Sequence, residues 1–390
     1  MARRPVRATL LLTVGALAFN AAAATLAVGP SAMYRTVATA ATAAHDGDVI
    51  EIAAGTYPED VAVFTQRRLT IRAIGGRATL DAKGRVAEGK AIFVLRNGDY
   101  TIEGLDFRGA RADDLNGAGI RFERGRLHVR DCTFADNEMG ILTGNDAAAE
   151  LIVEDSEFAD APRDRGPRKH LVYVGSIARF TMTGSRARNA YEGHLVKSRA
   201  RSSDIRYNLL DDGPDGRSSY ELEFPNGGRA IVIGNVIAQR STTTNPVVVA
   251  YGAEGPRWES NALYLVNNTL ATESVKGAAF LRIYERGWTS RPDVLAIDNL
   301  LLGPGAFPSG IATRFEGNVT AQGSFAREPG RNDYALPPDS ALRIRGVSPP
   351  EIDGESLAPV AEFAWPRGTR SISTPARYAP GAFQTPRDAR

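Results

Sequence analysis

The chain is poor in the residues that build disulfide frameworks and metal centres. Its 390 residues include one cysteine, four histidines and three tryptophans. A single cysteine excludes an internal disulfide, even for an exported protein in an oxidising compartment. No Cys/His or Asp-rich spacing indicates a tight transition-metal site.

An excess of charge of one sign is also missing. The sequence has 47 lysines and arginines against 45 aspartates and glutamates, so its formal net charge is +2. A protein that binds nucleic acid through its phosphates is expected to be clearly basic. The balance therefore argues against a nucleic-acid partner.

The apolar run from Ala8 to Phe19 is too short for a comfortable membrane span. It follows Arg3, Arg4 and Arg7 and precedes the alanines of residues 21–24, a pattern typical of a secretory signal peptide. Without residues 1–24 the chain loses three arginines and no acids, and the formal charge becomes 2 − 3 = −1. We expect a periplasmic or secreted monomer that has no membrane segment after cleavage.

One short pattern recurs along most of the chain. It alternates apolar and polar residues, is rich in Val, Ile, Phe and Tyr, and ends at Gly, Asn or Asp. Its anchor positions are Leu105, Cys132, Ser156, Ser185, Asn208, Asn235, Asn268 and Asn299, with spacings of 27, 24, 29, 23, 27, 33 and 31 residues. Such self-similarity predicts stacked repeats, and the strand-like units predict the coils of an all-β, parallel β-helix.

The asparagines at the anchor position support this fold. In a parallel stack each coil rises about 4.8 Å above the last. An Asn at the same corner of every coil can pass amide hydrogen bonds along the stack. It also tolerates the left-handed backbone that a sharp corner needs. Cys132 is then a small buried residue in this column rather than a catalytic thiol.

The repeat divides the chain into three regions. Residues 1–24 are the predicted signal peptide and residues 25–320 the solenoid, with a short capping helix predicted within residues 34–45. Residues 321–390 are rich in Pro and Arg. We expect them to form an irregular tail that packs on the solenoid.

A second strand follows the corner in each coil, and side chains alternate along a strand. With Val172, Val196 and Leu222 inward, a polar and aromatic stripe is expected outside. Its members would be Tyr173, Lys197, Arg199, Glu221, Glu223, Tyr251, Arg282 and Tyr284. His170 and His194 hold equivalent places in successive coils, and the basic loop that contains Arg168 precedes them.

The spacing of these residues poses a geometric problem. His194 and Lys197 are three residues apart, as are His170 and Tyr173, and such pairs fall on opposite faces of a regular strand. The histidines must therefore lie in the preceding turn, or a bulge must turn them outward. Trp258 and Trp288, in loops of later coils, would either stack on sugar rings or simply pack.

Two resemblances bear on fold and function. The stretch 46–58 resembles the opening of many secreted pectin-lyase-like proteins, which implies a single-stranded, right-handed parallel β-helix; the right-handed crossover rule points the same way. The block 191–235, with its Lys197-Ser198 pair and the Tyr207-Asn208 corner, resembles polysaccharide lyase family six, the chondroitinase B and alginate lyase group. That resemblance implies that Lys197 is a catalytic base.

The chain departs from the family pattern at two places. Where the family has its catalytic arginine, this chain reads Phe224-Pro225-Asn226-Gly227, and of the acids that hold calcium only Glu192 is present. A calcium cofactor therefore remains open. Arg199 and His194 are candidates for the missing positive charge, and Tyr173, supported by His170, for the acid.

The expected reaction is β-elimination on an acidic, uronate-containing polysaccharide. The base removes the proton beside the carboxylate, cations stabilise the developing enolate, and an acid protonates the leaving oxygen. As a base Lys197 must give up its own proton, which the nearby cations Arg199 and Arg201 favour. The substrate-binding residues would be Glu221, Glu223, Tyr251, Arg282, Tyr284 and Arg168.

Three other functions stay open at this stage. A related uronate epimerase would use the same residues. A glycoside hydrolase would use Glu221 and Glu223 as a carboxylate pair. A carbohydrate-binding or assembly scaffold would have no catalytic activity, because a fold alone does not determine function.

Overall fold

The computed structural model describes residues 23–164, 166, 169–275, 277–307, 312–321 and 334–386. Residues 1–22 of the predicted signal peptide and the predicted substrate-binding residue Arg168 lie outside the described residues.

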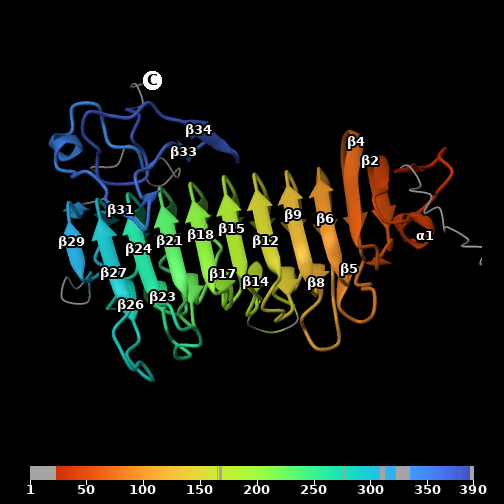
Figure 1. Ribbon diagram of the computed structural model, residues 1–390, viewed down its shortest axis with the longest axis horizontal. Coiled ribbons are helices and arrows are strands. Elements are labelled where there is room, and N and C mark those ends of the chain that lie inside the picture. Colours follow the sequence, from red (N-terminus) through yellow and green to blue (C-terminus); the bar gives the residue numbers. More distant parts are fainter. Residues whose placement is uncertain are drawn as a thin grey trace, which may run out of the picture.

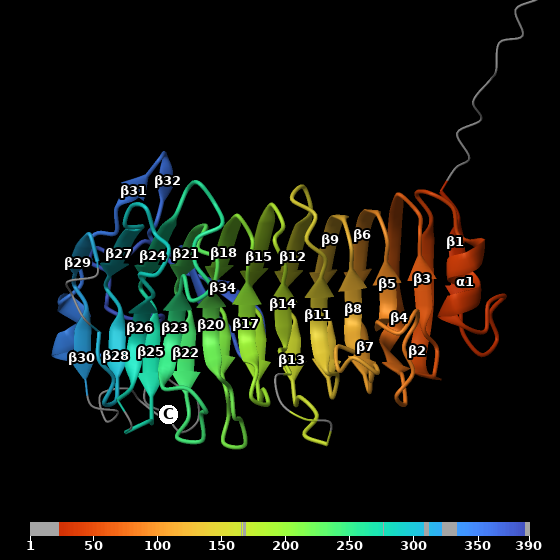
Figure 2. The same ribbon diagram turned by 90° about the horizontal axis from the view of Figure 1, so that it is seen from below.

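The chain winds into one long solenoid whose strands stack in parallel from coil to coil (Figures 1 and 2). Each full coil contributes one strand to each of three faces. The first and second faces belong to one 21-stranded sheet, and the third face is a separate 9-stranded sheet. The prediction of a right-handed parallel β-helix is confirmed.

The faces are built as follows. The first contains β6 (Gly98–Glu103), β9 (Gly125–Arg130), β12 (Glu150–Glu154), β15 (Arg179–Thr183), β18 (Ser202–Arg206), β21 (Arg229–Ile233), β24 (Ala262–Val266), β27 (Asp293–Ile297) and β29 (Arg314–Glu316). The second contains β7 (Leu105–Arg108), β10 (Thr133–Ala135), β13 (Glu157–Ala159), β16 (Arg186–Arg188), β19 (Leu209–Asp211), β22 (Val236–Gln239), β25 (Thr269–Thr272), β28 (Leu300–Leu302) and β30 (Val319–Ala321). The third contains β3 (Ala62–Phe64), β5 (Ala91–Leu95), β8 (Ala118–Phe122), β11 (Met139–Thr143), β14 (Val172–Val174), β17 (His194–Ser198), β20 (Tyr220–Phe224), β23 (Val247–Tyr251) and β26 (Ala279–Ile283).

The N-terminal end is closed by a short helix, as predicted. Strands β1 (Thr25–Val28), β2 (Val49–Pro58) and β4 (Arg68–Asp81) begin the 21-stranded sheet. Helix α1 (Val37–Ala43) packs its Val37, Ala40 and Ala41 against this end, and Thr36 caps it by accepting a hydrogen bond from the N–H of Thr39. The helix therefore covers apolar residues of the first coil. No helix within the described ranges is long and apolar enough to span a membrane.

The corner between the first and second faces carries the predicted hydrogen-bonded column. Asn208 N–H donates to Asn235 Oδ1 at 2.9 Å, Asn235 N–H to Asn268 Oδ1 at 3.0 Å, and Asn268 N–H to Asn299 Oδ1 at 3.0 Å. Cys132 and Ser156 occupy the column in earlier coils, where Cys132 is fully buried, and Asn318 extends it beyond Asn299. Inside the first coils the phenylalanines also stack, with Phe107, Phe134 and Phe158 nearly parallel at about 4.8–4.9 Å.

The described part of the C-terminal region lies over the last coils (Figure 1), and its Arg367 reaches back to Asp131 in the middle of the solenoid. It contains a 3₁₀ turn, η4 (Ala341–Ile344), and the short strands β31 (Glu351–Ile352), β32 (Glu355–Ser356), β33 (Ala361–Phe363) and β34 (Thr369–Ser371). Its Phe363 and Phe383 join the second-face residues Leu209 and Leu300 in one cluster. Leu357 packs on first-face residues in another cluster. The tail thus packs on the first and second faces.

Candidate functional site

The predicted residues gather on the third face, where β14, β17 and β20 lie side by side. Tyr173, Lys197 and Glu223 occupy paired positions on these three strands. The neighbouring column, Val172, Val196 and Leu222, is completely buried in the core, as predicted. The parallel stack therefore places a tyrosine, a lysine and a glutamate from successive coils in one row on the outside.

A local break in the ladder explains how residues three apart reach the same side. His194 pairs with Tyr220 and Val196 with Leu222, but the ladder skips Leu195 and Glu221. Leu195 and Val196 are both buried in the core. Because two successive side chains point inward, the side chains on either side of them, His194 and Lys197, both point outward. A bulge changes the direction of side chains in this way.

Glu223 is the common partner of His194 and Lys197. Its Oε2 lies 3.0 Å from His194 Nδ1 and 3.1 Å from Lys197 Nζ. Neither contact has hydrogen-bond geometry, since Glu223 Oε2 and His194 Nδ1 have no partner with such geometry. Glu223 is only 2% exposed. Its position fixes the two side chains relative to each other.

Charge states at this contact follow from burial and from the neighbours. Burial opposes ionisation of Glu223, but His194 and Lys197 outweigh it and hold the pKa of this carboxyl below its ordinary value. Burial lowers the pKa of His194, although Glu223 acts against the shift. The lowered pKa favours the neutral imidazole, so Arg199 is a better candidate than His194 for the source of positive charge.

Arg199 and Lys197 meet a second carboxylate, that of Glu254, which lies in the loop after β23. Lys197 Nζ lies 3.0 Å from Glu254 Oε1, and Arg199 Nη2 lies 2.7 Å from both oxygens. Arg199 also donates to the hydroxyl of Tyr173, and its guanidinium lies 4.9 Å from the centre of the Tyr173 ring. Lys197 and Arg199 thus hold one carboxylate between them, and the Tyr173 hydroxyl is bonded to Arg199; we call these three groups the carboxylate clamp.

An aromatic row runs along the outside next to the clamp. The ring centres of His170 and His194 are 4.6 Å apart, and those of His194 and Tyr220 are 5.0 Å apart. His170 Nδ1 accepts a hydrogen bond from the N–H of His194, so a neutral His170 carries its proton on Nε2. The Tyr220 hydroxyl meets that of Tyr284 at 2.9 Å, and Arg282 lies over the Tyr284 ring. From His170 beside β14 to Tyr284 after β26 the row spans five coils of the solenoid.

Two predicted outward residues point inward instead. Glu221 is fully buried and accepts hydrogen bonds from Ser218 Oγ and Gln239 Nε2. Burial, with Asp212 nearby, raises the pKa of Glu221 well above its ordinary value. Tyr251 is also fully buried, with its hydroxyl bonded to the carbonyl of Gly228. Glu221 lies inward because of the break in the ladder, whereas Tyr251 lies inward because it pairs with the buried Phe224, two residues beyond the inward Val249.

The pattern of repeats missed Glu254 and Tyr220. Tyr220 had a detectable signal, since it occupies the place of His194 on the next coil. Glu254 had none, because it lies in a loop outside the repeat. Trp258 packs beside the clamp and donates from Nε1 to the carbonyl of Arg199 at 3.1 Å.

The residues expected for calcium do not fit a calcium site. Glu192, the remaining acid of that pattern, pairs with Arg217 at 3.0 Å. Across the described residues no group of three or more His, Cys, Asp or Glu is arranged to hold a metal ion. We therefore assign no step to a bound metal.

Comparisons with known proteins bear on the fold. No protein-family model matches the chain, and a search of curated proteins also finds no match. Among solved structures the chain is similar to the crystal structure of pectate lyase Pel9A, with a TM-score of 0.63 and 14% sequence identity over 93% of this chain and 97% of that one. The likeness shows that the two proteins share the parallel β-helix fold, and the activity has to be argued from the site.

Proposed function

We propose that this protein is an exported lyase that cleaves a uronate-containing polysaccharide by β-elimination, or a uronate epimerase that begins with the same proton abstraction. The carboxylate clamp is the observation that carries the proposal. Lys197 and Arg199 converge on the carboxylate of Glu254, and Arg199 also binds the Tyr173 hydroxyl. We infer that the uronate carboxylate of the substrate takes the place of Glu254.

The clamp matches what the elimination requires. The proton beside a carboxylate is too weakly acidic to be removed unless the charge that develops on the carboxylate is stabilised. Arg199 supplies a permanent cation for this purpose, with Nε and Nη2 as donors. Lys197, positioned by Glu223, acts as the neutral amine after giving its own proton to solvent. It takes the substrate proton, and the electron pair of the broken C–H bond forms the new double bond as the bond to the leaving oxygen breaks.

Tyr173 is the proposed acid. Its hydroxyl lies against Arg199 and its ring under the guanidinium, so it stands beside the bound carboxylate. It gives its proton to the leaving oxygen, and water restores it afterwards. His194 and His170 act as positioning residues, since His194 contacts Glu223, and His170 accepts the backbone N–H of His194.

The geometry argues against the hydrolase alternative. Glu221 faces the interior and Glu223 faces outward, so the two carboxyls lie on opposite sides of β20. A glycosidase needs both carboxyls flanking one sugar bond. A purely binding scaffold would show affinity for the same polysaccharides without cleavage.

The test is an assay of the mature protein on a panel of pectate, alginate and glucuronate-containing polysaccharides, with and without calcium. Ultraviolet absorbance of the unsaturated product reports elimination, reducing-end analysis reports any cleavage, and NMR of the intact polymer reports epimerisation. Absorbance that rises with one polymer would support the lyase. New reducing ends without absorbance would contradict it, as would binding without any change in the polymer.

A further inference from the structure

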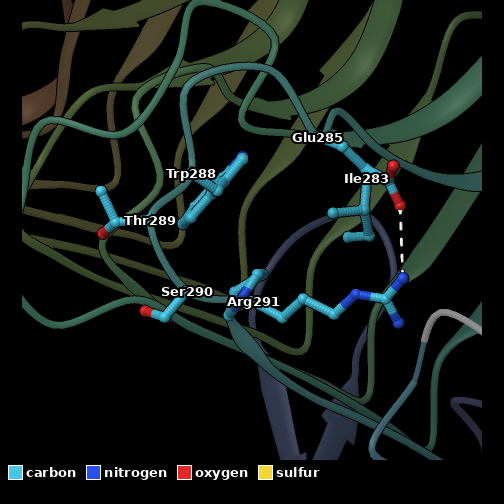
Figure 3. A pocket seen from close by; sticks show the side chains of 7 residues that line it. Ile283, Glu285, Trp288, Thr289, Ser290 and Arg291 are labelled. Atoms are coloured by element: carbon cyan, nitrogen blue, oxygen red, sulfur yellow. Dashed lines mark ion pairs between the residues drawn. The ribbon is translucent and has the colours of Figure 1, made fainter.

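A hollow lies on the outside of the last coils, next to the loop after β26. Ile283, Trp288 and Arg291 line it, and Glu285 closes one side (Figure 3). Its volume is about 270 Å³. It therefore has room for a small group such as a sugar unit.

Trp288 is held in place by an aromatic ring and by two glycines. Its ring stacks on the buried Tyr251 with centres 5.6 Å apart and planes at 18°. A Cβ on Gly252 would lie 2.7 Å from Cζ2 of the indole, and one on Gly227 would lie 2.9 Å from Cη2. The indole is only partly buried and also lines the hollow. A rigid aromatic surface is thus presented to whatever enters.

The aromatic row joins this hollow to the clamp. His194 contacts Tyr220, Tyr220 meets Tyr284, and the Nε1–H of Trp288 donates to the carbonyl of Tyr284 at 2.5 Å. Lys197, Glu223, Ala250 and Arg282 occupy paired positions on successive coils. Three steps of about 4.8 Å separate Lys197 from Arg282, which is roughly 14 Å, the reach of a short oligosaccharide.

The charges beside the hollow suit an acidic sugar. Arg291 and Glu285 are 83% and 76% exposed and their charged groups are 3.8 Å apart. An exposed pair of this kind contributes little stability, so Arg291 can exchange Glu285 for a ligand carboxylate. Arg282, also exposed, lies between the hollow and the clamp.

We propose that this hollow is a second sugar-binding subsite. A unit of the same acidic polysaccharide stacks on Trp288 and pairs its carboxylate with Arg291, so that the polymer lies along the solenoid from the clamp to the last coils. The proposal rests on the proposed function and extends it, because it assigns the direction and length of the bound chain.

The test measures binding, so that it does not depend on turnover. Isothermal titration calorimetry would compare wild type, Trp288→Ala and Arg291→Ala, using disaccharides and long oligomers of galacturonate, of guluronate and of mannuronate. Each substitution is expected to raise the Kd for the long oligomer, Trp288→Ala by roughly tenfold. Neither should change the Kd of a disaccharide bound at the clamp, which does not reach the hollow.

The controls separate the two proposals. Trp365→Ala removes another exposed tryptophan, on the tail, and should leave every Kd unchanged. Arg291→Ala alters a highly exposed side chain, so its effect survives even if Trp288→Ala fails to fold. Wild type that binds and cleaves, with unchanged Kd in both variants, would overturn the subsite alone. Wild type that binds no uronate oligomer would overturn the proposed function and the subsite with it.

Discussion

The ammonium of Lys197 lies 3.1 Å from the carboxylate of Glu223, its paired residue on the next coil. Their side chains are only 10% and 3% exposed. The pair is thus fixed by the coil-to-coil register and largely shielded from water, where charge interactions are stronger than at the surface. This arrangement holds the nitrogen of Lys197 in a fixed position relative to Arg199 and Tyr173.

Replacing Lys197 with methionine should abolish elimination while the solenoid remains folded. Loss of a general base costs about 10²- to 10⁴-fold in rate. Glu223 keeps its contact with His194, so the fold should survive. Initial rates from product absorbance and a circular dichroism melt would test both expectations. The matched control is Lys90→Met, which removes another ion pair on the same sheet and should leave the rate unchanged. Full activity of Lys197→Met would disprove the role of Lys197 as the base.

The fold was predictable because the repeated pattern itself implies a stack of coils. Only a stack of coils brings asparagines that are 27 and 33 residues apart into one hydrogen-bonded column, and Asn208, Asn235 and Asn268 form it. The inward column of Val196 and Leu222 was predictable for the same reason.

The site was only partly predictable. Regular alternation places Glu221 and Glu223 on one side of the strand, and the break in the ladder separates them. Glu254 could not be found, since its contacts with Lys197 and Arg199 span 57 and 55 residues and depend on the path of one loop. Repeat patterns predict the stacked core and do not predict loop paths.

Substituting Asn235 with alanine should destabilise the solenoid. Asn235 is completely buried; its Oδ1 accepts two hydrogen bonds from Asn208, and its Nδ2 donates to the carbonyl of Ile205. Each buried group left without a partner costs about 1–3 kcal/mol, so we expect the free energy of unfolding to fall by roughly 2–5 kcal/mol. Urea unfolding measures it, with the exposed Asn116→Ala as control. Equal stability of the two variants would argue against the asparagine column as a main source of the stability of the solenoid.

Asp298 should make the protein less stable as the pH rises. It is fully buried, with φ of 53°, and its carboxyl accepts the N–H of Val347 from the tail. Burial raises its pKa from 3.8 to about 7. The stability that it contributes is present below about pH 4, where both states are protonated, and is lost as the pH rises through about 7.

Asp298→Asn removes this titration and keeps a residue that tolerates positive φ. The variant should therefore be more stable than wild type at pH 8, by roughly 2–4 kcal/mol, and its stability should vary less between pH 4 and 8. Urea unfolding across this range measures both. The exposed Asp113→Asn serves as control; a pH dependence unchanged in Asp298→Asn would assign the effect to other groups.

Replacing Glu254 with glutamine should strengthen substrate binding. In the structure Glu254 occupies the carboxylate clamp, and Arg199 and Lys197 outweigh its burial and hold its pKa below the ordinary value. It therefore stays ionised at neutral pH and competes with the carboxylate of the substrate. The side chain is 41% exposed, so the competition is worth about 1 kcal/mol or less and KM should fall about two- to fivefold, with kcat nearly unchanged. Steady-state kinetics on the cleaved polymer measures KM and kcat separately.

Glu259→Gln is the control for this prediction. It changes an exposed acid of the same loop and should alter neither constant. A large loss of kcat in Glu254→Gln would instead make Glu254 part of the chemistry, because removing a mere competitor cannot slow the bond-breaking step.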